Sequence, residues 1–316
     1  MSCIIQEQTD LPLIDWMSNR FPSRTRSQWI MAIENGRVHL NHQQAHCDSR
    51  LNSGDLLVTY REEVPEPQVP LVFDVLRETE DWCIVDKPPG LPVHPGGVFY
   101  QHTLWYQAKK RWPDLILMNR IDRETSGCVI MAKTKKGNRY WHGLIRDNHL
   151  DKEYLCLVHG CPDLEPNTWT EVSGYLTPDT RTSIQKKVLF LTPRESENLP
   201  YDLRIPSTTL VRPLSQHGSY TLVQCKLITG KTHQIRATME ALGTPLVGDK
   251  MYGTDPNLYV KWIRRELDQG DREALVLDRQ ALHSWSLSWT DGDGQAYQIR
   301  ADLPRDMAGI MDRSTE

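Results

Sequence analysis

The spacing of hydrophobic positions changes once within the first sixty residues. Residues 11–20 have the spacing of a short helix, and a second helix is expected to follow with Ser23 as its N-cap. That helix would turn Ile30 and Ile33 inward and stop at Gly36, because glycine readily adopts the left-handed conformation that ends many helices. The pattern therefore predicts two short helices in succession.

Alternating positions replace the helical spacing after the second helix. Residues 38–41 and 56–60 have the pattern of short strands, so residues 1–62 are expected to form a small α/β module. Residues 63–70 contain three prolines, which favour an extended backbone and disfavour a helix. We interpret residues 63–70 as a linker between this module and the rest of the chain.

Strand-like and helix-like segments alternate beyond the linker. Strands are expected on both sides of an acidic turn within residues 73–88 and at 127–133, 153–160 and 219–228, with helices at 136–146 and 232–242. No internal repeat or low-complexity tract interrupts this order. The pattern predicts a mixed α and β domain over residues 71–305, and residues 306–316 have the composition of a frayed tail.

The last of these helices follows a Thr-Gly-Lys-Thr segment. Thr232 is expected to cap it, because a threonine hydroxyl can accept a hydrogen bond from a free N–H group of the first turn. Ile235, Met239 and Leu242 then share one face of the helix. Arg236 is placed on its first turn.

Composition narrows the class of protein. The 316 residues are 39% hydrophobic and 25% charged, which is ordinary for a soluble globular protein, and no run approaches the roughly 18 apolar residues of a membrane span. With no secretory signal pattern at the N-terminus, we expect a cytoplasmic protein. The seven cysteines form no Cys-x-x-Cys pair, which indicates reduced thiols. A net charge of −4 means that any RNA contact must be a local patch.

The common motifs of nucleotide binding, acyl transfer and metalloproteolysis are absent from the sequence. The strongest metal candidates are His39, His42, His46 and Cys47, but their spacing fits no standard site, and solvated loop histidines are the favoured interpretation. The basic runs at 109–111 and 133–136 are most simply solvated faces.

A different signal lies in the stretch NRIDRETSG, residues 119–127, where Asp122 stands between Arg120 and Arg123 ahead of a turn-forming Thr-Ser-Gly. In most proteins such an aspartate forms a structural ion pair. A catalytic aspartate would instead need a cation that keeps it ionised, a loop that can meet an extruded base, and a phosphate-binding arginine beside it.

Several motifs, taken in order, resemble one enzyme family. They are NRIDRETSG, VDKPPGLPVHP (85–95), DKEYLCLVHG (151–160) and TGKTHQIRATMEALGTPLVGDKMYG (229–253). Together they resemble the motif set of the RluA-type ribosomal and transfer RNA pseudouridine synthases, over roughly residues 71–300. The segments RTRSQWIMAIENGRVHLN and LNSGD resemble the αL RNA-binding module that precedes the catalytic domain in many of these enzymes.

The resemblance implies an α+β pseudouridine synthase fold with a central mixed, mainly antiparallel β-sheet flanked by helices. It implies Asp122 as the catalytic aspartate, Tyr154 as the tyrosine packed against the target base, and Arg236 as the basic partner of the aspartate. Without the motif, Tyr154 would be interpreted as a core aromatic of a strand. The reaction implied is the isomerisation of uridine in ribosomal or transfer RNA, which requires no metal, redox cofactor or activated donor.

The family pattern also implies contacts with RNA. They are expected from Arg120, Arg123, Lys231 and His233 in the catalytic domain and from Arg24, Arg26, Ser27 and Arg37 in the N-terminal module. The chain departs from the pattern at Asn119, where the family usually has histidine, and at Ala237-Thr238, where Val-His is common. These departures affect the expected substrate contacts more than the chemistry.

Two rival functions use the same residues differently. A non-catalytic RNA-binding or ribosome-assembly factor could keep the fold, although it would have no need for Asp122, Tyr154 and Arg236 together. A hydrolase with Asp122 as nucleophile would lack a second carboxylate or metal set to activate water. We therefore expect a monomeric RNA-modifying isomerase, and the first chemical step of Asp122 stays open between the sugar C1′, the C2′ proton and the base.

Overall fold

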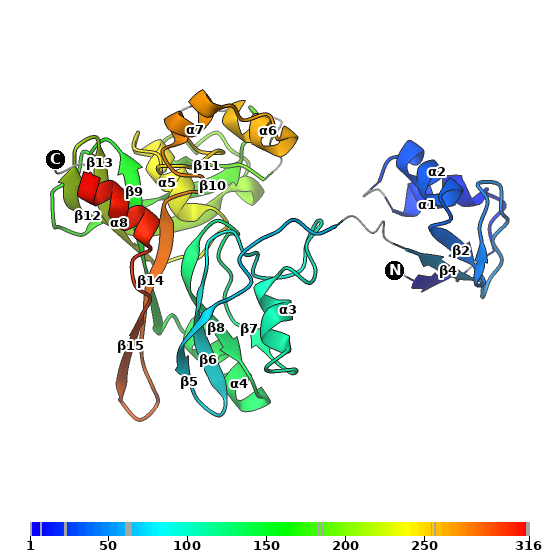
Figure 1. Ribbon diagram of the computed structural model, residues 1–316, viewed down its shortest axis with the longest axis horizontal. Helices are drawn as coiled ribbons and strands as arrows, with labels where there is room; N and C mark the ends of the chain where they lie inside the picture. Colours follow the sequence, from blue (N-terminus) through cyan, green and yellow to red (C-terminus); the bar gives the residue numbers. More distant parts are fainter. Residues whose placement is uncertain are drawn as a thin grey trace. The chain divides into compact units, whose positions relative to one another are not determined.

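Two separate units make up the chain, residues 1–65 and residues 66–316. The computed structural model describes residues 2–6, 8–21, 24–60, 65–182, 184, 186–253, 255 and 257–313, and Figure 1 labels their helices and strands. The division falls inside the proline-rich segment of the sequence. None of the helices in the described ranges combines the length and the apolar character that a membrane crossing requires.

A four-stranded antiparallel sheet and two helices form the N-terminal unit, with strand order β1-β4-β2-β3. Its elements are β1 (Ser2–Ile4), α1 (Leu13–Arg20), α2 (Arg26–Glu34), β2 (Val38–Leu40), β3 (Gln43–Gln44) and β4 (Leu56–Thr59). The two helices and strands β2 and β4 lie where the sequence pattern places them, whereas β1 and β3 were not predicted. Their buried side chains form one core that includes Leu13, Met17, Trp29 and Leu57.

Helix α2 begins with a capping box rather than with the predicted serine. The Thr25 hydroxyl accepts from the Gln28 N–H, and the Gln28 side chain accepts from the Thr25 N–H. Ser23 lies outside the described residues. Ile33 is buried in the core and Ile30 packs against it, as the helical spacing predicted.

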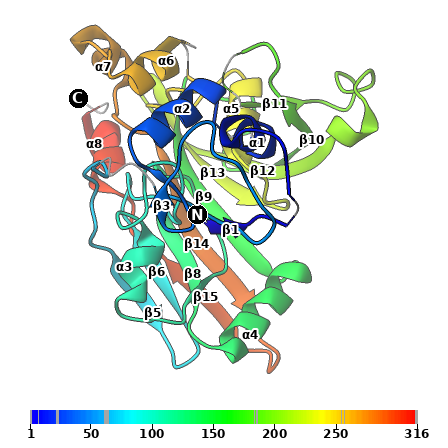
Figure 2. The same cartoon turned by 90° about the vertical axis from the view of Figure 1, so that its right-hand side faces the viewer.

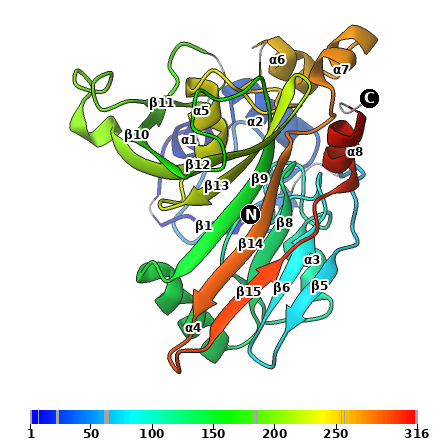
Figure 3. The ribbon, with the colours of Figure 1, turned by 90° about the vertical axis from the view of Figure 1, so that its left-hand side faces the viewer.

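A single large sheet organises the second unit. Its order is β11-β10-β12-β13-β9-β14-β8-β6-β5, with β15 paired to β14 and β7 to β8. Figure 3 shows β9, β14, β8 and β6 side by side. The strands are β5 (Asp74–Glu78), β6 (Trp82–Lys87), β7 (Ile116–Leu117), β8 (Ser126–Ala132), β9 (Leu150–His159), β10 (Thr170–Pro178), β11 (Val188–Leu191), β12 (Ile205–His217), β13 (Tyr220–Leu227), β14 (Leu282–Thr290) and β15 (Ala296–Arg300).

Within the described residues of this sheet, β8 and β14 are the one parallel pair, and the other neighbours are antiparallel. The predicted α+β class with a mixed, mainly antiparallel sheet is therefore confirmed. Strands β5, β6, β8, β9 and β13 lie at the predicted segments, whereas no strand was predicted at the segments of β7, β10 to β12, β14 and β15.

Helices pack on both faces of the sheet because successive residues of a strand point to opposite sides. Tyr154 and Cys156 of β9 pack with Ile235 and Met239 of α5, while Leu157 packs toward the other face. Figure 2 shows β9 and α5, the two elements that carry these residues. The helices are α3 (Leu104–Lys109), α4 (Lys135–Arg146), α5 (Gln234–Ala241), α6 (Asn257–Arg264), α7 (Gln269–Leu275) and α8 (Arg305–Arg313), with a 3-10 turn η1 (Tyr201–Leu203).

The prediction of a frayed tail over residues 306–316 is wrong as far as residue 313. Residues 305–313 form α8, and its Met307 and Ile310 are buried in a cluster with Leu157 of β9. Figure 1 shows α8 beside β12 and β13. A short polar helix with two inward apolar residues leaves little pattern in the sequence, although its burial is complete at those two positions.

Candidate active site

The loop of residues 118–125 carries Asp122 between β7 and β8. A turn closes the loop, since the Thr125 N–H donates to the Asp122 carbonyl at 3.2 Å. The fully buried Lys87 at the end of β6 donates from Nζ to the Arg123 carbonyl at 3.1 Å and to two carbonyls of its own segment. These bonds fix the backbone at Asp122 and directly after it.

Ser126 and Gly127 of the Thr-Ser-Gly segment begin a strand, so the turn lies before them, where Thr125 bonds back to Asp122. Ser126 and Gly127 are the first residues of β8, where it runs parallel to β14. Gly127 has φ +105°, and a Cβ atom there would lie 2.2 Å from the Ser284 carbonyl oxygen. Only glycine allows this approach of the two strands, and the approach sets where the Asp122 loop ends.

Arg236 of α5 joins Asp122 to a second, buried carboxylate. Its Nη1 donates to Asp122 Oδ2 at 3.0 Å, while Nε and Nη2 donate to the two oxygens of Asp249 at 2.6 and 2.9 Å. The guanidinium also lies over the Tyr252 ring, 4.8 Å from its centroid. The three donors and the ring leave the arginine one orientation, as the fork geometry of a guanidinium favours.

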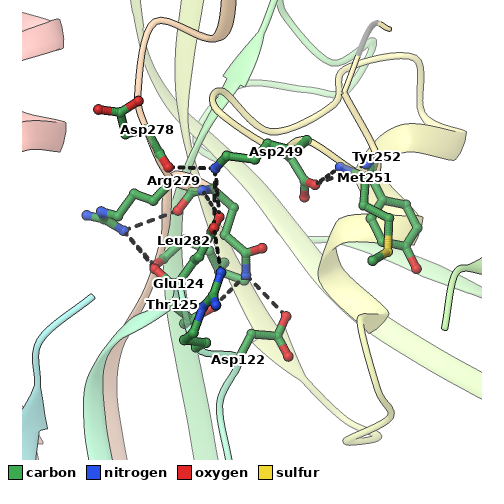
Figure 4. Close-up of polar contacts among 12 residues, drawn as sticks. Asp122, Glu124, Thr125, Asp249, Met251, Tyr252, Asp278, Arg279 and Leu282 are labelled. Atoms are coloured by element: carbon green, nitrogen blue, oxygen red, sulfur yellow. Dashed lines mark hydrogen bonds and ion pairs between the residues drawn. The ribbon is translucent and has the colours of Figure 1, made fainter. Parts of the chain in front are cut away.

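Asp249 is fully buried and was not singled out from the sequence, although the Gly-Asp-Lys-Met-Tyr-Gly motif contains it. Its Oδ1 also accepts from the N–H groups of Met251 and Tyr252, both at 3.0 Å, as Figure 4 shows. Burial raises the pKa of Asp249, but the Arg236 guanidinium and these hydrogen bonds lower it by more. The net effect is a lowered pKa, so the carboxylate is ionised. Its position in that motif was the available signal.

Gln280 is the second donor to Asp122 and was also missed. Its Nε2 donates to Asp122 Oδ2 at 3.1 Å and to the Thr125 hydroxyl at 2.7 Å. The Gln280 carbonyl accepts from Arg279 Nη1 at 3.1 Å. Arg279 is fixed in turn by Asp306 of α8, whose Oδ2 accepts from Arg279 Nε at 2.6 Å. Nothing local in the sequence marks Gln280, because its partners lie more than 150 residues away.

Electrostatics keep Asp122 ionised. Burial raises the pKa of this carboxyl, and the Arg236 guanidinium opposes that effect. With His233 and the Gln280 hydrogen bond added, the pKa of Asp122 falls below its ordinary value. In the described part of the chain both hydrogen bonds to the carboxylate fall on Oδ2, so Oδ1 is the oxygen available to a substrate.

His233, predicted to contact RNA, is the N-cap residue of α5, a position that the sequence pattern assigned to Thr232. It adopts the left-handed conformation with φ 56°, and no side chain caps the helix. Its Nδ1 lies 3.0 Å from the Tyr252 hydroxyl and its Nε2 lies 3.9 Å from Asp122 Oδ1. Burial lowers the pKa of His233, so the ring is neutral at pH 7.

Tyr154 lies on β9, where its ring is both part of the core and part of a cleft. It is 7% exposed and packs with Ile235 and Leu282. Burial raises the pKa of its phenol to about 12, so the hydroxyl keeps its proton at neutral pH. Its two interpretations from the sequence, core aromatic and site residue, therefore both describe its position.

The cleft next to Tyr154 has a volume of about 540 Å³. It is lined by side chains of the Asp122 loop, of β9 and of the segment before α5: Leu117, Met118, Asn119, Arg120, Ile121, Asp122, Ile145, Leu150, Lys152, Tyr154, Leu227, Gly230, Lys231, Thr232 and His233. The cleft thus contains Arg120, Lys231 and His233, three of the four catalytic-domain residues predicted to contact RNA. A carboxylate, an aromatic ring and several cations meet in a space large enough for a nucleoside.

Arg123, the fourth predicted contact, points elsewhere. Its guanidinium lies over the Trp262 ring, 4.7 Å from the centroid, and within 5.7 Å of the Phe99 centroid. It lines a second cleft, which also reaches Asp122. The arginines on either side of the aspartate in sequence are therefore not its hydrogen-bond partners within the described structure.

The remaining predicted contacts belong to the N-terminal unit. Arg26 and Ser27 are exposed on α2, where Arg26 contacts Asp15 at 3.1 Å, and the Arg24 guanidinium lies over the Trp29 ring at 4.7 Å. With Arg37 they stay predicted RNA contacts. His39 Nε2 lies 3.1 Å from the Gly36 carbonyl oxygen. Across the described ranges, no three His, Cys, Asp or Glu side chains are grouped to hold a metal ion.

The departures from the family pattern have structural roles. Asn119 Oδ1 accepts from the Ile130 N–H of β8 at 2.7 Å, which holds the start of the Asp122 loop against the sheet. Ala237 and Thr238 are fully buried in α5, where Ala237 packs with Tyr252. Of these three residues, Asn119 alone lines the cleft.

Comparison with known proteins agrees with this geometry. The sequence profile of RNA pseudouridylate synthase matches residues 81–241. The chain is 29% identical over 253 residues to the mitochondrial tRNA pseudouridine(32) synthase of Saccharomyces cerevisiae, covering 78% of this chain and 51% of that protein. It is 33% identical over 284 residues to the pseudouridylate synthase RPUSD2 of Mus musculus, covering 87% and 48%. The chain therefore spans about half the length of these two relatives.

A bacterial relative matches over most of both chains. The ribosomal large subunit pseudouridine synthase D of Nitrosomonas europaea is 27% identical over 309 residues, covering 93% of this chain and 82% of that protein. Among solved structures, human RNA pseudouridylate synthase domain containing 1 shares the fold, with a TM-score of 0.58 at 21% identity over 78% of this chain and 90% of that one. The profile match and these relatives confirm the family resemblance: the chain belongs to the RNA pseudouridylate synthase family.

Proposed function

We propose that this protein converts specific uridines of structured RNA into pseudouridine, with Asp122 as the catalytic carboxylate. The observation that carries the proposal is the constellation around Asp122: an ionised aspartate, held on one oxygen by Arg236 and Gln280, faces a cleft that contains Tyr154. A binding protein would gain nothing from keeping a half-buried carboxylate charged at a surface that meets phosphates, because the charge would repel them.

The chemistry needs only such a carboxylate and a closed site. The C1′–N1 bond of uridine breaks, the uracil turns, a C1′–C5 bond forms, and the proton of C5 is lost while N1 gains one, so product and substrate are isomers. Attack by Asp122 at C1′, removal of the C2′ proton and addition to the base all begin from the ionised form. The low pKa of Asp122 supports each of these first steps.

Tyr154 would pack its ring against the uracil in this scheme. Its raised pKa of about 12 keeps the phenol neutral, so it can stack on a base or pass a proton through its hydroxyl, and it does not act as a phenolate. Arg120 and Lys231, which line the same cleft, would balance the phosphates on either side of an extruded nucleotide.

The substrate would be ribosomal or transfer RNA, because the named relatives include a tRNA synthase and a ribosomal large subunit synthase. Residues 1–65 would act as an αL-type RNA-binding module ahead of the catalytic domain. We propose that the protein works as a cytoplasmic monomer; its seven free cysteines suit a reducing compartment, while the yeast relative is named as mitochondrial. Light scattering and cell fractionation test these two points.

The decisive experiment maps pseudouridines chemically in total RNA from cells with the gene, without it, and with Asp122→Asn in its place. The variant should lose the modification completely, while its affinity for RNA in vitro changes by less than about tenfold, because affinity is spread over phosphate contacts. Asp151→Asn is the matched control. Asp151 also forms an ion pair, with its Oδ2 2.8 Å from Lys226 Nζ, but it lines no part of the cleft. Modification retained in Asp122→Asn would contradict the assignment.

A further inference from the structure

We propose that a second cleft, built around Trp262, binds an unpaired base next to the target nucleotide by stacking it on the indole ring. This inference rests on the proposed function, since it assigns a second RNA base to the same site. The cleft has a volume of about 540 Å³ and shares Asp122, Arg120 and His233 with the first one, but Tyr154 is not part of its wall.

Aromatic side chains from two distant segments form this cleft. Phe99 comes from the loop before α3, whereas Tyr259 and Trp262 come from α6, with their ring centroids 5.8 Å apart. Leu258 is the buried residue that attaches α6 to the domain, and Trp262 itself is half-buried. A half-buried indole at the wall of a cleft is the kind of platform on which single-stranded bases stack.

In the free protein a cation lies over that ring. The Arg123 guanidinium is 4.7 Å from the Trp262 centroid, and Lys250 Nζ is 5.4 Å from it. A guanidinium is planar and stacks on aromatic rings in the way a base does, so it holds the indole in a stacking position. A base that displaced Arg123 would stack on the indole ring in its place. The released arginine would then lie next to the phosphates of the same RNA.

The charges around the cleft suit RNA. Five cations line it, from Arg120, Arg123, Lys186, Arg236 and Lys250, against two carboxylates from Asp122 and Glu124. Glu124 is itself engaged, with an oxygen 3.1 Å from Lys250 Nζ. Lys186 is exposed at the rim, where a phosphate can reach it. Aromatic faces inside and cations around them are the combination that binds an unpaired nucleotide.

The test compares two RNA hairpins with the same stem, one with a seven-nucleotide loop of uridines and one with abasic residues in that loop. Trp262→Ala should weaken binding of the uridine hairpin by about 5- to 150-fold, the range expected for one stacked base, and leave binding of the abasic hairpin unchanged. Trp262→Phe should keep most of the affinity. Binding is measured at equilibrium by fluorescence anisotropy at fixed salt, with thermal melting to verify folding.

Trp285→Ala is the matched control. Trp285 is also half-buried and lies under an arginine, with the Arg300 guanidinium 4.8 Å from its centroid, but it is not part of the cleft. It should not discriminate between the two hairpins. Equal losses on both hairpins for Trp262→Ala, or no loss on either, would overturn the proposal. Pseudouridine formation is measured separately, so a protein that stacks bases on Trp262 yet modifies no RNA would refute the proposed function alone.

Discussion

Removing the cation beside Asp122 without stranding a buried charge is the most informative perturbation of this site. Arg236→Ala alone would leave the fully buried Asp249 unpaired, which typically costs about 3–5 kcal/mol of folding stability. The double variant Arg236→Gln with Asp249→Asn removes both charges and lets the two amides hydrogen-bond in the same place. We expect it to fold and to retain the shape of the site.

The expected effect is on the charge of Asp122. Burial raises the pKa of this carboxyl, and Arg236 is the largest influence that lowers it. The pKa of Asp122 should therefore be higher in the double variant than in the wild type. Loss of a cation at 3.0 Å typically raises a carboxyl pKa by about one to three units. The proposed reaction starts from the ionised form, so the acidic limb of the rate profile should move upward by about one to three pH units, with activity recovering at alkaline pH.

The assay is single-turnover conversion, from about pH 5 to 9, of an RNA that the wild-type protein modifies. RNA is kept saturating so that a binding defect does not enter the rate. The matched control is Arg181→Gln with Asp179→Asn. Arg181 also forms an ion pair with a buried aspartate, with its Nε 3.0 Å from Asp179 Oδ1, and it lines neither cleft. The control variant should have the wild-type profile.

A loss of rate that is the same at every pH would refute this reasoning and assign Arg236 an orienting role. A loss that more RNA cures would make Arg236 a substrate-binding residue. Arg236→Lys provides an independent check, since it keeps one positive charge without the fork: it should retain more activity near neutral pH than the double variant if charge is what counts.

Two further predictions concern the domains and the strand that carries the site. A chain of residues 66–316 should fold alone, yet bind RNA more weakly and with a shallower salt dependence than the full chain; an unchanged slope would mean that residues 1–65 have another role. Gly127→Ala should lower the free energy of unfolding in urea by about 1–3 kcal/mol or more, because its Cβ would clash with the Ser284 carbonyl. The control Gly143→Ala has open space around the new Cβ and should be neutral or stabilising by up to about 1 kcal/mol. Equal effects of the two substitutions would contradict the close approach of the strands at Gly127.

The parts of the fold that could be predicted are those in which one local pattern decides the outcome. Strands β6, β8 and β9 are continuous buried runs, and Ile235 and Met239 of α5 have the spacing of a helix face. Boundaries were less predictable because several residues could serve. At α2, Thr25 is the cap because Gln28 completes a capping box, and at α5 the left-handed His233 replaces Thr232.

Residues whose role depends on distant partners could not be predicted. Gln280 has an ordinary sequence context, and only the pairing of β14 with β8 brings it beside Thr125 and Asp122. Asp249 is 13 residues from Arg236 and looks like any turn aspartate until the fold buries it. The polar network of the site is thus a product of the sheet, whereas the role proposed for Asp122 could be inferred from its motif.

The two arginines that flank Asp122 in sequence show why local charge patterns mislead about ion pairs. Arg120 and Arg123 both line clefts that reach Asp122, yet neither forms an ion pair with its carboxylate in the described structure. Arg120 lines the first cleft, Arg123 lies on Trp262 in the second, and the ion pair of Asp122 comes from a residue 114 positions away. The proposed substrate would therefore meet cations on each side of an ionised carboxylate that is already paired with Arg236, which is the arrangement that the proposed function requires.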